Sequence, residues 1–460
     1  MKFRSIVVMV LFVIATAAAG EKMVLTLEKS VDLALENNPD FQIAQRELVK
    51  ARAAVTEAYS AVLPSLQGSV NFQHAWEIQQ STIPNFLKFM LGPAADLVPE
   101  LKQMPDFVQI SFGLENTFTY GLVLQQPLFL GGAGLAGIKI ASAARRAAEH
   151  NMEMTKQELI YRSTQAFYSC LLAEELVEVQ AQALEQAEAN LEIVQKKYRA
   201  GSASGFDRMR AEVEAANLRP SLISARNGLK LALTNLRNIL GFSETVDLEL
   251  QGSLFYVDDE FAERGLNELR ALAMEGRPEI AALEQQKTIA RKSVALARSS
   301  FLPKVYFQTD YSFLAMRNDY NFQRDDFSKG FSSAISLQIP LFQGFRNAKQ
   351  YQKAQVDVRI MVDTEKKIRD GISAEVEMAF HNFSEAREKY LSAAESVELA
   401  EEALRLANLT YEEGASTQLD VLNSNLALTR ARMNTASSIF EYQMARYELR
   451  KVTGVLTGIL

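Results

Sequence analysis

The chain carries the same succession of short motifs twice, in the same order. The repeated pairs are LALENNPDF (33–41) with LAMEGRPEI (272–280), VLPSL (62–66) with FLPKV (301–305), QQPLFLGG (125–132) with QIPLFQGF (338–345), and YRAGSASGFD (198–207) with YEEGASTQLD (411–420). The first two pairs are separated by 239 residues and the last two by 213. So long a period indicates one duplication rather than a solenoid of short repeats. The difference between 239 and 213 places 26 extra residues in the first half, within about Glu77–Phe107.

Each half is predicted to contain a helix, two strands, a very long helix, a turn and a long returning helix. The first structural repeat takes residues 21–250, with strands at about 64–77 and 108–129 and a helical hairpin at about 132–240. The second takes residues 265–460, with strands at about 303–314 and 330–342 and a helical hairpin at about 345–454. Residues 251–264 form an equatorial linker between the two repeats.

The outgoing helices are expected to be exceptionally long. No proline interrupts the 67 residues from Gly132 to Tyr198, which would span roughly 100 Å as a helix. Large residues recur every seven positions, as in a coiled coil, so partners are expected along the whole length. The recurring positions are Cys170, Val177, Leu184, Leu191 and Tyr198; Phe383, Tyr390, Val397, Leu404 and Tyr411, with Ala386, Ala393, Ala400 and Ala407; and, on the second returning helix, Leu419, Leu426, Met433, Phe440 and Tyr447. Cys170 is therefore expected to be a packing residue.

The glycine-centred turns are predicted to be the two tips of the helical hairpins. Gly201 and Gly414 each end an outgoing helix, because glycine readily adopts the left-handed conformation found after a helix C-terminus. The spacing of a capping box, which begins the next helix, recurs in both tips as Ser204 with Asp207 and Thr417 with Asp420.

Prolines mark two departures from the internal symmetry. Pro220 lies in the first returning helix where the second has Met433, so a kink or π-bulge is expected near Leu218–Leu222. The extra segment contains Pro84, Pro93, Pro99 and Pro105, which argue against a continuous strand. We expect it to form an outward-facing loop, with a short helix around Pro84–Leu91.

The first 20 residues have the pattern of a secretory signal peptide. Lys2 and Arg4 precede an apolar run and a group of small residues, and the run is too short to span a bilayer as a helix. The mature chain then begins at Gly20 or Glu21; an uncleaved anchor is the alternative. No later segment offers the roughly 18 uninterrupted apolar residues of a membrane helix, so entry into a membrane requires β-strands.

The predicted strands alternate in the manner of an outer-membrane barrel. In residues 65–76, Leu66, Val70, Phe72 and Trp76 alternate with polar residues, and residues 304–313 repeat the pattern. A soluble sandwich with one buried face is the alternative for any single strand. Four strands cannot close a barrel alone, and open edges are not tolerated in lipid, so copies of the chain must assemble. Three copies would supply twelve strands.

Composition excludes several other classes of function. A net charge of −7 and a pI near 5.4 argue against a nucleic-acid surface. The histidines, His74, His150 and His381, lack metal-ligand spacing, and no set of residues indicates catalysis. Gly131, Gly132 and Gly134 are better explained as a strand-to-helix hinge than as a phosphate loop, because no Gly-Lys-Ser/Thr follows. No cofactor, metal site or catalytic residue is predicted.

The doubled motifs resemble those of the TolC-like outer-membrane efflux proteins, over nearly all of the mature sequence. The resemblance rests on the duplicated starts, the Leu-Pro strand entries, the PLFLGG and PLFQGF exits, the Tyr-x-x-Gly-x5-Asp tips and a final glycine near the C-terminus. It implies a mainly α protein with membrane β, as a homotrimer in which four strands per chain form a twelve-stranded outer-membrane barrel. A periplasmic α-helical tunnel continues that barrel.

The function implied by the resemblance is that of the exit duct of a tripartite efflux or type I secretion system. Its partners would be a periplasmic adaptor, an inner-membrane transporter and outer-membrane lipid, with no nucleic acid. The alternative is a structural periplasmic coiled-coil protein without channel activity.

The resemblance also places the functional residues at the hairpin tips. Tyr198, Gly201, Tyr411 and Gly414 would shape the surface that the adaptor touches, and Asp207, Asp420, Glu412 and Glu413 would constrict the tip. Relatives latch the tip with a basic residue two places after the second-half glycine, but Ser416 stands there. A basic cluster surrounds the first tip instead: Lys196, Lys197, Arg199, Arg208 and Arg210. Ordinary solvated helix ends, with both aspartates acting only as caps, remain the alternative.

Overall fold

A computed structural model of the 460-residue chain describes residues 23–92, 105–242 and 246–456, so the predicted signal peptide lies outside the described residues. The chain divides into two compact units, and each contains segments of both predicted repeats. The helical unit comprises the described residues within Met1–Lys50, Arg146–Gln285 and Val362–Leu460, and the sheet unit those within Ala51–Arg145 and Gln286–Met361.

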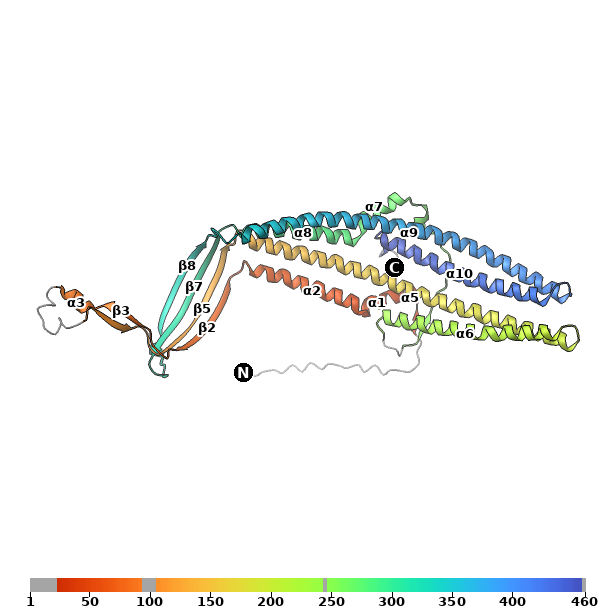
Figure 1. Ribbon diagram of the computed structural model, residues 1–460, viewed down its shortest axis with the longest axis horizontal. Coiled ribbons are helices and arrows are strands. Elements are labelled where there is room, and N and C mark those ends of the chain that lie inside the picture. The colour runs from red at the N-terminus through yellow and green to blue at the C-terminus, as the bar shows by residue number, and fades with distance from the viewer. Residues whose placement is uncertain (1–22, 93–104, 243–245, 457–460) are drawn as a thin grey trace, which may run out of the picture. The chain divides into compact units, whose positions relative to one another are not determined.

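The helices confirm the duplicated plan (Figure 1). Four helices of the first half are α1 (Leu27–Asn37), α2 (Pro39–Ser60), α5 (Ala133–Arg199) and α6 (Gly205–Ile239). Their counterparts are α7 (Leu266–Gly276), α8 (Pro278–Ser299), α9 (Arg346–Glu412) and α10 (Gln418–Val452). Each pair has the same length, and its bounds differ by the separation found in the sequence, 239 residues for the first two pairs and 213 for the others.

Local sequence explains where these helices begin. Pro39 and Pro278 open α2 and α8, at the position where a missing backbone N–H costs nothing. Ser204 and Thr417 occupy the N-cap positions of α6 and α10. Helices as long as α5 and α9, of 67 residues each, depend on packing along one face for most of their stability.

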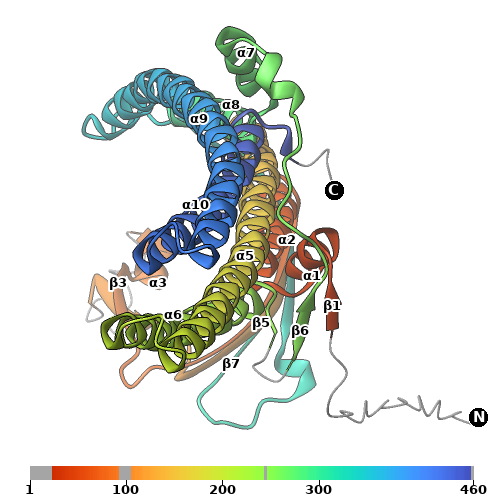
Figure 2. The same cartoon turned by 90° about the vertical axis from the view of Figure 1, so that its right-hand side faces the viewer.

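Two apolar cores hold the helical unit together. The first joins α1, α5 and α6 to a parallel strand pair, β1 (Met23–Leu25) and β6 (Leu248–Leu250). It buries Cys170 completely, which confirms the packing role; burial raises the pKa of that thiol to about 12. The second core joins α7, α9 and α10 around Phe383 and Tyr442. Within this unit, α5, α6, α9 and α10 form a curved layer, and α1, β1, β6 and α7 lie on its convex side (Figure 2).

The equatorial linker is fixed to α10 by buried polar contacts. The Asp259 side chain is fully buried and its Oδ2 accepts from Arg446 at 2.5 Å and from Arg450 at 2.8 Å. The Tyr442 hydroxyl donates to the Val257 carbonyl at 2.6 Å. Burial of Asp259 opposes its ionisation, but the Phe261 N–H and the two guanidinium groups outweigh this effect and lower its pKa.

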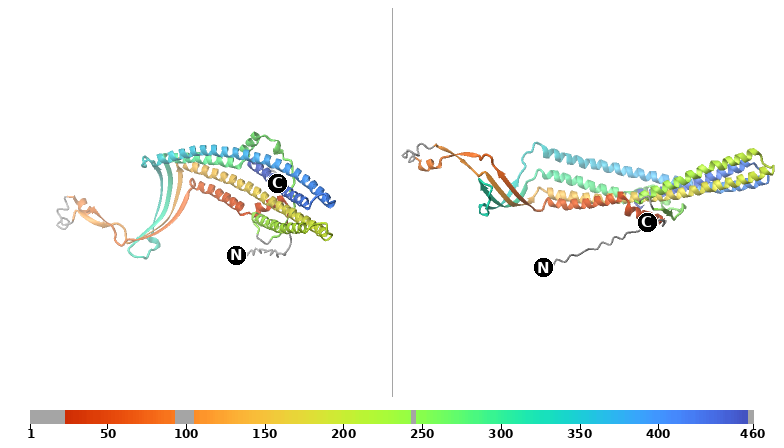
Figure 3. Two further views of the ribbon diagram at one scale, coloured as in Figure 1. Left: turned by 45° about the vertical axis from the view of Figure 1, so that its right-hand side comes forward. Right: turned by 90° about the horizontal axis from the view of Figure 1, so that it is seen from below.

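The sheet unit contains one four-stranded antiparallel sheet, shown from two directions in Figure 3. Its strands are β2 (Ser65–His74), β5 (Asn116–Phe129), β7 (Lys304–Arg317) and β8 (Ser328–Gln338), in the spatial order β2-β5-β7-β8. The alternation predicted from sequence gives the sheet one apolar and one polar face. Apolar residues that share a face across the register are Val70, Tyr120, Phe313 and their alternate neighbours along each strand.

The structure corrects two of the predicted strands. The strand expected at 108–129 is two strands, β4 (Phe107–Ser111) and β5, separated by a break that includes Gly113 at φ +104°. The strand expected at 330–342 ends at Gln338, two residues before Pro340, whose ring removes a backbone donor. Within the described residues, no helix is long and apolar enough to cross a membrane.

The extra segment of the first half contains regular secondary structure and is not only a loop. β3 (Gln80–Pro84) pairs with β4 in an antiparallel hairpin, and α3 (Phe86–Leu91) follows β3. The expected short helix is therefore confirmed, whereas the expectation of a loop was wrong for the hairpin; residues 93–104 lie outside the described part. The expectation at Pro220 was also partly wrong: α6 continues through it as α-helix without a π turn.

Candidate functional site at the hairpin tips

Both tips end their outgoing helix in the same way. Gly201 and Gly414 have φ angles of +78° and +77°, which glycine adopts without steric cost. In the first tip the Gly201 N–H donates to the Tyr198 carbonyl at 3.0 Å, and the next N–H, of Ser202, donates to the Lys197 carbonyl at 2.9 Å. The second tip repeats this pair of bonds, which satisfies carbonyls left free at a helix end.

The two tip aspartates act as helix caps. Asp207 Oδ2 accepts from the backbone N–H of Ser204 at 3.1 Å and from its hydroxyl at 2.6 Å. Asp420 Oδ2 accepts from Thr417 in the same way, at 2.8 and 2.7 Å. These hydrogen bonds favour the ionised form and lower the pKa of both carboxyl groups. The capping boxes predicted from the sequence are therefore present in both tips.

A contact between the two tips joins Lys197 of α5 to Tyr411 of α9. Lys197 Nζ donates to the Tyr411 carbonyl at 3.0 Å and lies 3.8 Å from the centre of its ring. Partial burial, together with the nearby Asp207 carboxylate, raises the pKa of the Tyr411 hydroxyl. The sequence indicates this contact only through the duplication, because the position equivalent to Lys197 in the second half is Thr410.

The other tip charges are distributed unequally. Lys196 pairs with Glu192 one turn before it on α5. Arg208 lies 5.0 Å from the centre of the Tyr198 ring, and Arg210 lies over Phe206. In the described part of the chain, Glu412 and Glu413 take part in no ion pair. Of the four predicted gate residues, these two therefore have no charged partner among the described residues of their own chain, whereas Asp207 and Asp420 cap helices.

Ser416, which replaces the expected basic residue, is bound to its own hairpin. Its hydroxyl lies 3.0 Å from the Thr410 hydroxyl and 3.4 Å from the Ala407 carbonyl.

A cavity of about 270 Å³ lies behind the second tip, lined by Tyr411, Asn190 and Asn425 among others. The Asn190 amide nitrogen and the Asn425 carbonyl oxygen are buried there without a protein partner. A polar cavity of that size is roomy enough for water.

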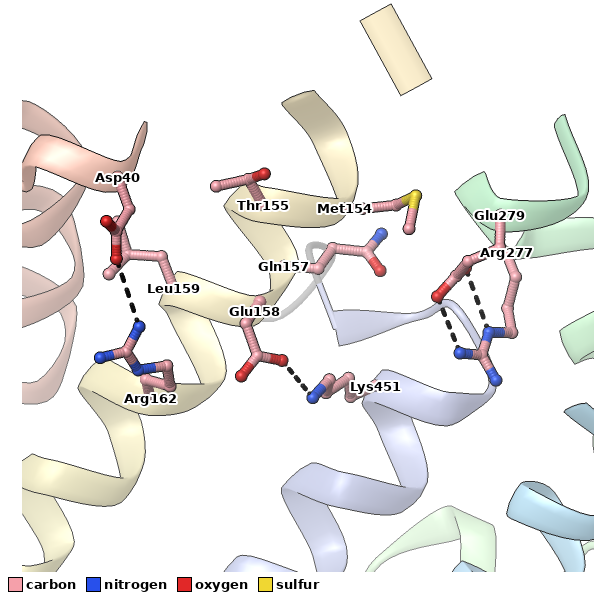
Figure 4. A pocket seen from close by; sticks show the side chains of 10 residues that line it. All are labelled: Asp40, Met154, Thr155, Gln157, Glu158, Leu159, Arg162, Arg277, Glu279 and Lys451. Atoms are coloured by element: carbon pink, nitrogen blue, oxygen red, sulfur yellow. Dashed lines mark hydrogen bonds and ion pairs between the residues drawn. The ribbon is translucent and has the colours of Figure 1, made fainter. Parts of the chain in front are cut away.

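A second polar cavity, of about 360 Å³, lies where α2, α5, α8 and α10 meet (Figure 4). Arg162 points to Asp40 with an N–O distance of 3.4 Å, and Lys451 is paired with Glu158. Arg277 holds Glu279 in two hydrogen bonds of 2.8 and 3.2 Å. All of these charges are paired, so the network joins the helices around the cavity.

The duplication shows how this network changed between the halves. Arg162 and Asp40 correspond to Glu375 and Glu279, which are two acids. Arg277, in the position equivalent to Asn38, supplies the positive charge that is missing there, because it pairs with both of these glutamates. The same helix contacts are thus held by one ion pair in the first half and by a shared arginine in the second.

The alternating sheet and the two long helical hairpins together define an outer-membrane channel subunit. The same fold occurs in the Campylobacter jejuni CmeC outer membrane channel, with a TM-score of 0.77 and 18% identity over 94% of this chain and 86% of that one. It also occurs in the open state of the Neisseria gonorrhoeae MtrE outer membrane channel, with a TM-score of 0.73 and 19% identity over 94% and 89% of the two chains.

The chain belongs to the outer membrane efflux protein family, whose profile matches residues 30–242 and 269–455. Among curated relatives, the alkaline protease secretion protein AprF of Pseudomonas aeruginosa is 25% identical over 92% of this chain and 83% of its own length. The cobalt-zinc-cadmium resistance protein CzcC of Cupriavidus metallidurans is 24% identical over 96% of each chain. The fold class, the channel function and the outer-membrane location predicted from the sequence are confirmed.

Proposed function

We propose that three copies of this chain form the exit duct of an efflux or type I secretion system, and that a periplasmic adaptor and an inner-membrane transporter deliver its substrates. The four-stranded sheet carries the proposal. It has one apolar face, one polar face and two unpaired edges, which lipid does not tolerate unless other copies close the sheet. A structural coiled-coil protein without a channel would not need such a sheet.

The adaptor is proposed to bind the hairpin tips. The Tyr198 side chain is 42% exposed, and a Cβ at Gly201 or Gly414 would meet nothing within 4 Å, so each turn is open to an incoming surface. Tyr411 differs, because Lys197 covers its ring. We therefore assign Tyr198, Gly201 and Gly414 to the adaptor surface, with Tyr411 exposed to the adaptor only when Lys197 moves away.

The gate is proposed to consist of two kinds of contact. Lys197 holds the two tips of one chain together through Tyr411. Glu412 and Glu413 face the basic cluster of the next copy, since first and second tips alternate around a trimer. Asp207 and Asp420 act by fixing the helix starts that position these groups. Exposed contacts of these kinds stabilise by only about 0.5–1 kcal/mol each, but a trimer repeats each of them three times.

Single-channel conductance in planar bilayers tests the gate. Lys197→Met should destabilise the closed state by about 1 kcal/mol per copy, and three copies would raise the open-to-closed ratio roughly 100-fold. Replacing Glu412 and Glu413 with lysine should also raise conductance and reduce its dependence on ionic strength, because exposed charge pairs are screened by salt.

Lys196→Met is the matched control for the Tyr411 contact, since the ion pair of Lys196 among the described residues is with Glu192 of its own helix. It removes the same charge from the basic cluster but leaves the contact between Lys197 and Tyr411 in place, so it should raise conductance much less than Lys197→Met does. If Lys196→Met and Lys197→Met raise conductance equally, net charge governs the tip and the specific contact does not. If neither the lysine nor the glutamate variants change conductance in an intact trimer, the gate lies elsewhere.

A further inference from the structure

A cavity of about 540 Å³ lies where β7 and β8 meet the helices that enter and leave them. Ser300, just after α8, and Lys304, the first residue of β7, line one side of it. Residues between Gln338 and Gln350, from the end of β8 into α9, line the other side. All of them belong to the sheet unit. In an outer-membrane channel of this family the strands cross the bilayer and the helices lie in the periplasm, so the cavity lies at the periplasmic edge of the bilayer.

The cavity is positively charged. Lys304 and Arg346 line it, and the other described residues of its lining are uncharged. Lys304 is half-buried, and it forms no ion pair with any residue in the described part of the chain. The Arg346 guanidinium donates to the neutral side-chain amide of Gln343. Because burial of a charge is costly unless the charge is paired, an anion bound between these two cations would be stabilised.

The duplication provides an internal comparison for this cavity, because the equivalent positions of the first half are not charged. The counterparts of Lys304, Gln343, Arg346, Asn347 and Gln350 are Ser65, Leu130, Ala133, Gly134 and Gly137. Gly134 is tightly packed, since a Cβ there would lie 2.3 Å from Val62 Cγ1. In the second half Asn347 is buried instead, and its Nδ2 donates to the Ser300 carbonyl at 2.8 Å. A strand-to-helix junction of this fold therefore forms without the cations, so their presence in the second half needs another explanation.

Exposed apolar side chains form the rim of the same cavity. Leu341 and Phe342 line it and are 92% and 75% exposed. The apolar face of the sheet begins close by in the chain, where Leu337 and Ile335 of β8 are exposed as well. Cations beside an apolar surface at the edge of a bilayer match the two parts of a phospholipid, its charged phosphate and its acyl chains.

We propose that this cavity binds the headgroup of a phospholipid from the periplasmic leaflet of the outer membrane. The Arg346 guanidinium offers paired N–H donors that suit two phosphate oxygens, and the Lys304 ammonium adds a second positive charge. The acyl chains lie against Leu341 and Phe342. A free phosphate would use only the charged part of the cavity, and a neutral lipid only its apolar rim. The site is separate from the channel activity and does not depend on the number of copies in the assembly.

Native mass spectrometry of the purified protein in mild detergent tests the site with three probes. Dioleoyl phosphatidylglycerol should bind at one tight site per chain. Dioleoylglycerol has the same acyl chains but no phosphate, so it should bind roughly 30-fold more weakly, because it lacks the contacts with both cations. Inorganic phosphate has no acyl chains and should not displace phosphatidylglycerol when the two are present at equal concentration. These measurements need no variant of the protein.

Variants assign the binding to the two cations. Lys304→Gln combined with Arg346→Gln should weaken the binding of phosphatidylglycerol roughly 30-fold, since each cation near an anionic headgroup contributes about fivefold. Lys304→Arg keeps the charge and should bind normally. Lys349→Gln is the matched control, because Lys349 follows Arg346 on α9, bonds to Gln352 of the same helix at 2.9 Å and is not among the lining residues. It should weaken binding by no more than about twofold, since exposed charges away from the site are screened.

Undiminished binding of phosphatidylglycerol by the double variant would overturn the site. Equally tight binding of dioleoylglycerol would reduce it to an apolar surface, and equally tight binding of inorganic phosphate would reduce it to an anion site without a lipid; either result contradicts the proposal. Equal losses in the double variant and in Lys349→Gln would show that general surface charge attracts the lipid. Conductance of the same preparations reports on the channel separately, so a conducting channel without the lipid site would leave the proposed function standing.

Discussion

At the scale of single residues, the equatorial linker depends on one buried charge. Asp259 is the shared acceptor for Arg446 and Arg450, and its side chain is fully buried. Removing one member of a buried ion pair leaves its partners uncompensated and costs about 3–5 kcal/mol. The neighbouring Asp258 also faces an arginine, Arg387, but its side chain is 78% exposed, and an exposed pair contributes about 0–1 kcal/mol.

Asp259→Asn should therefore lower the melting temperature of the helical signal measured by circular dichroism, and Asp258→Asn should hardly change it. The pKa of Asp259 is lowered in the folded protein, so its contribution to stability is present above the unfolded value of about 3.9 and is lost as pH falls through the folded value. The difference between the two variants should hence disappear in strong acid. Equal melting temperatures near pH 7 would show that the linker does not need this charge.

The contacts of single residues were the part of the site that the sequence predicted least well. The caps at Asp207 and Asp420 could be predicted because their partners lie three residues away. The contact between Lys197 and Tyr411 could not, because it joins residues 214 positions apart and depends on how the two hairpins lie against each other. The pairing of Arg277 with Glu375 was missed for the same reason.

At the scale of elements, the extra hairpin of the first half is predicted to be dispensable for assembly. β3, α3 and β4 lie between β2 and β5, and the pairing of β2 with β5 runs through His74 and Asn116 without them. Replacing residues 79–112 with a short turn should leave a trimer of normal mobility in mild detergent. Loss of the trimer would mean that the hairpin holds copies together.

Deleting Thr119 alone is the contrasting control, because a one-residue slip turns the rest of β5 over. It removes far less of the chain and should abolish assembly. Equal effects of the two deletions would indicate general intolerance of this region and not a specific need for strand register.

The elements themselves were largely predictable, since duplication, heptads and alternation are periodic signals. The buried face of α10, however, could not be predicted from its heptad pattern. Leu419 and Leu426 follow the predicted heptad but are 46% and 45% exposed, whereas Val421 and Leu428 are buried. In the proposed trimer, α10 would have neighbouring helices on both sides, and one chain supplies only part of them. The predicted and the observed apolar stripes would then be two contact faces of one helix.

At the scale of the whole molecule, the boundary between copies should be sensitive to a single added methyl group. A Cβ at Gly344 meets nothing within 4 Å among the described residues. At Gly131, its counterpart in the first half, a Cβ would lie 2.8 Å from the Ser299 carbonyl, so in the proposed trimer Gly344→Ala should clash with the backbone of the next copy. The heat-induced dissociation temperature of the trimer, followed on gels, should fall. Gly132→Ala is the control, because it carries a similar positive φ with open space and so shares the backbone strain without the clash. Equal dissociation temperatures would place the boundary elsewhere.

The two sheet edges, β2 and β8, are different surfaces, so in the proposed trimer each copy would join its neighbours head to tail. A subunit whose β8 edge is blocked still has an intact β2 edge, so it can pair with a normal copy through β2. Its β8 edge cannot pair with a further copy, and the normal subunits bound to it are trapped in incomplete trimers. When such a gene is expressed beside the normal one, intact channels should decline as the cube of the normal fraction. An edge mutation would thus be genetically dominant, whereas a mutation that unfolds the chain outright would be recessive.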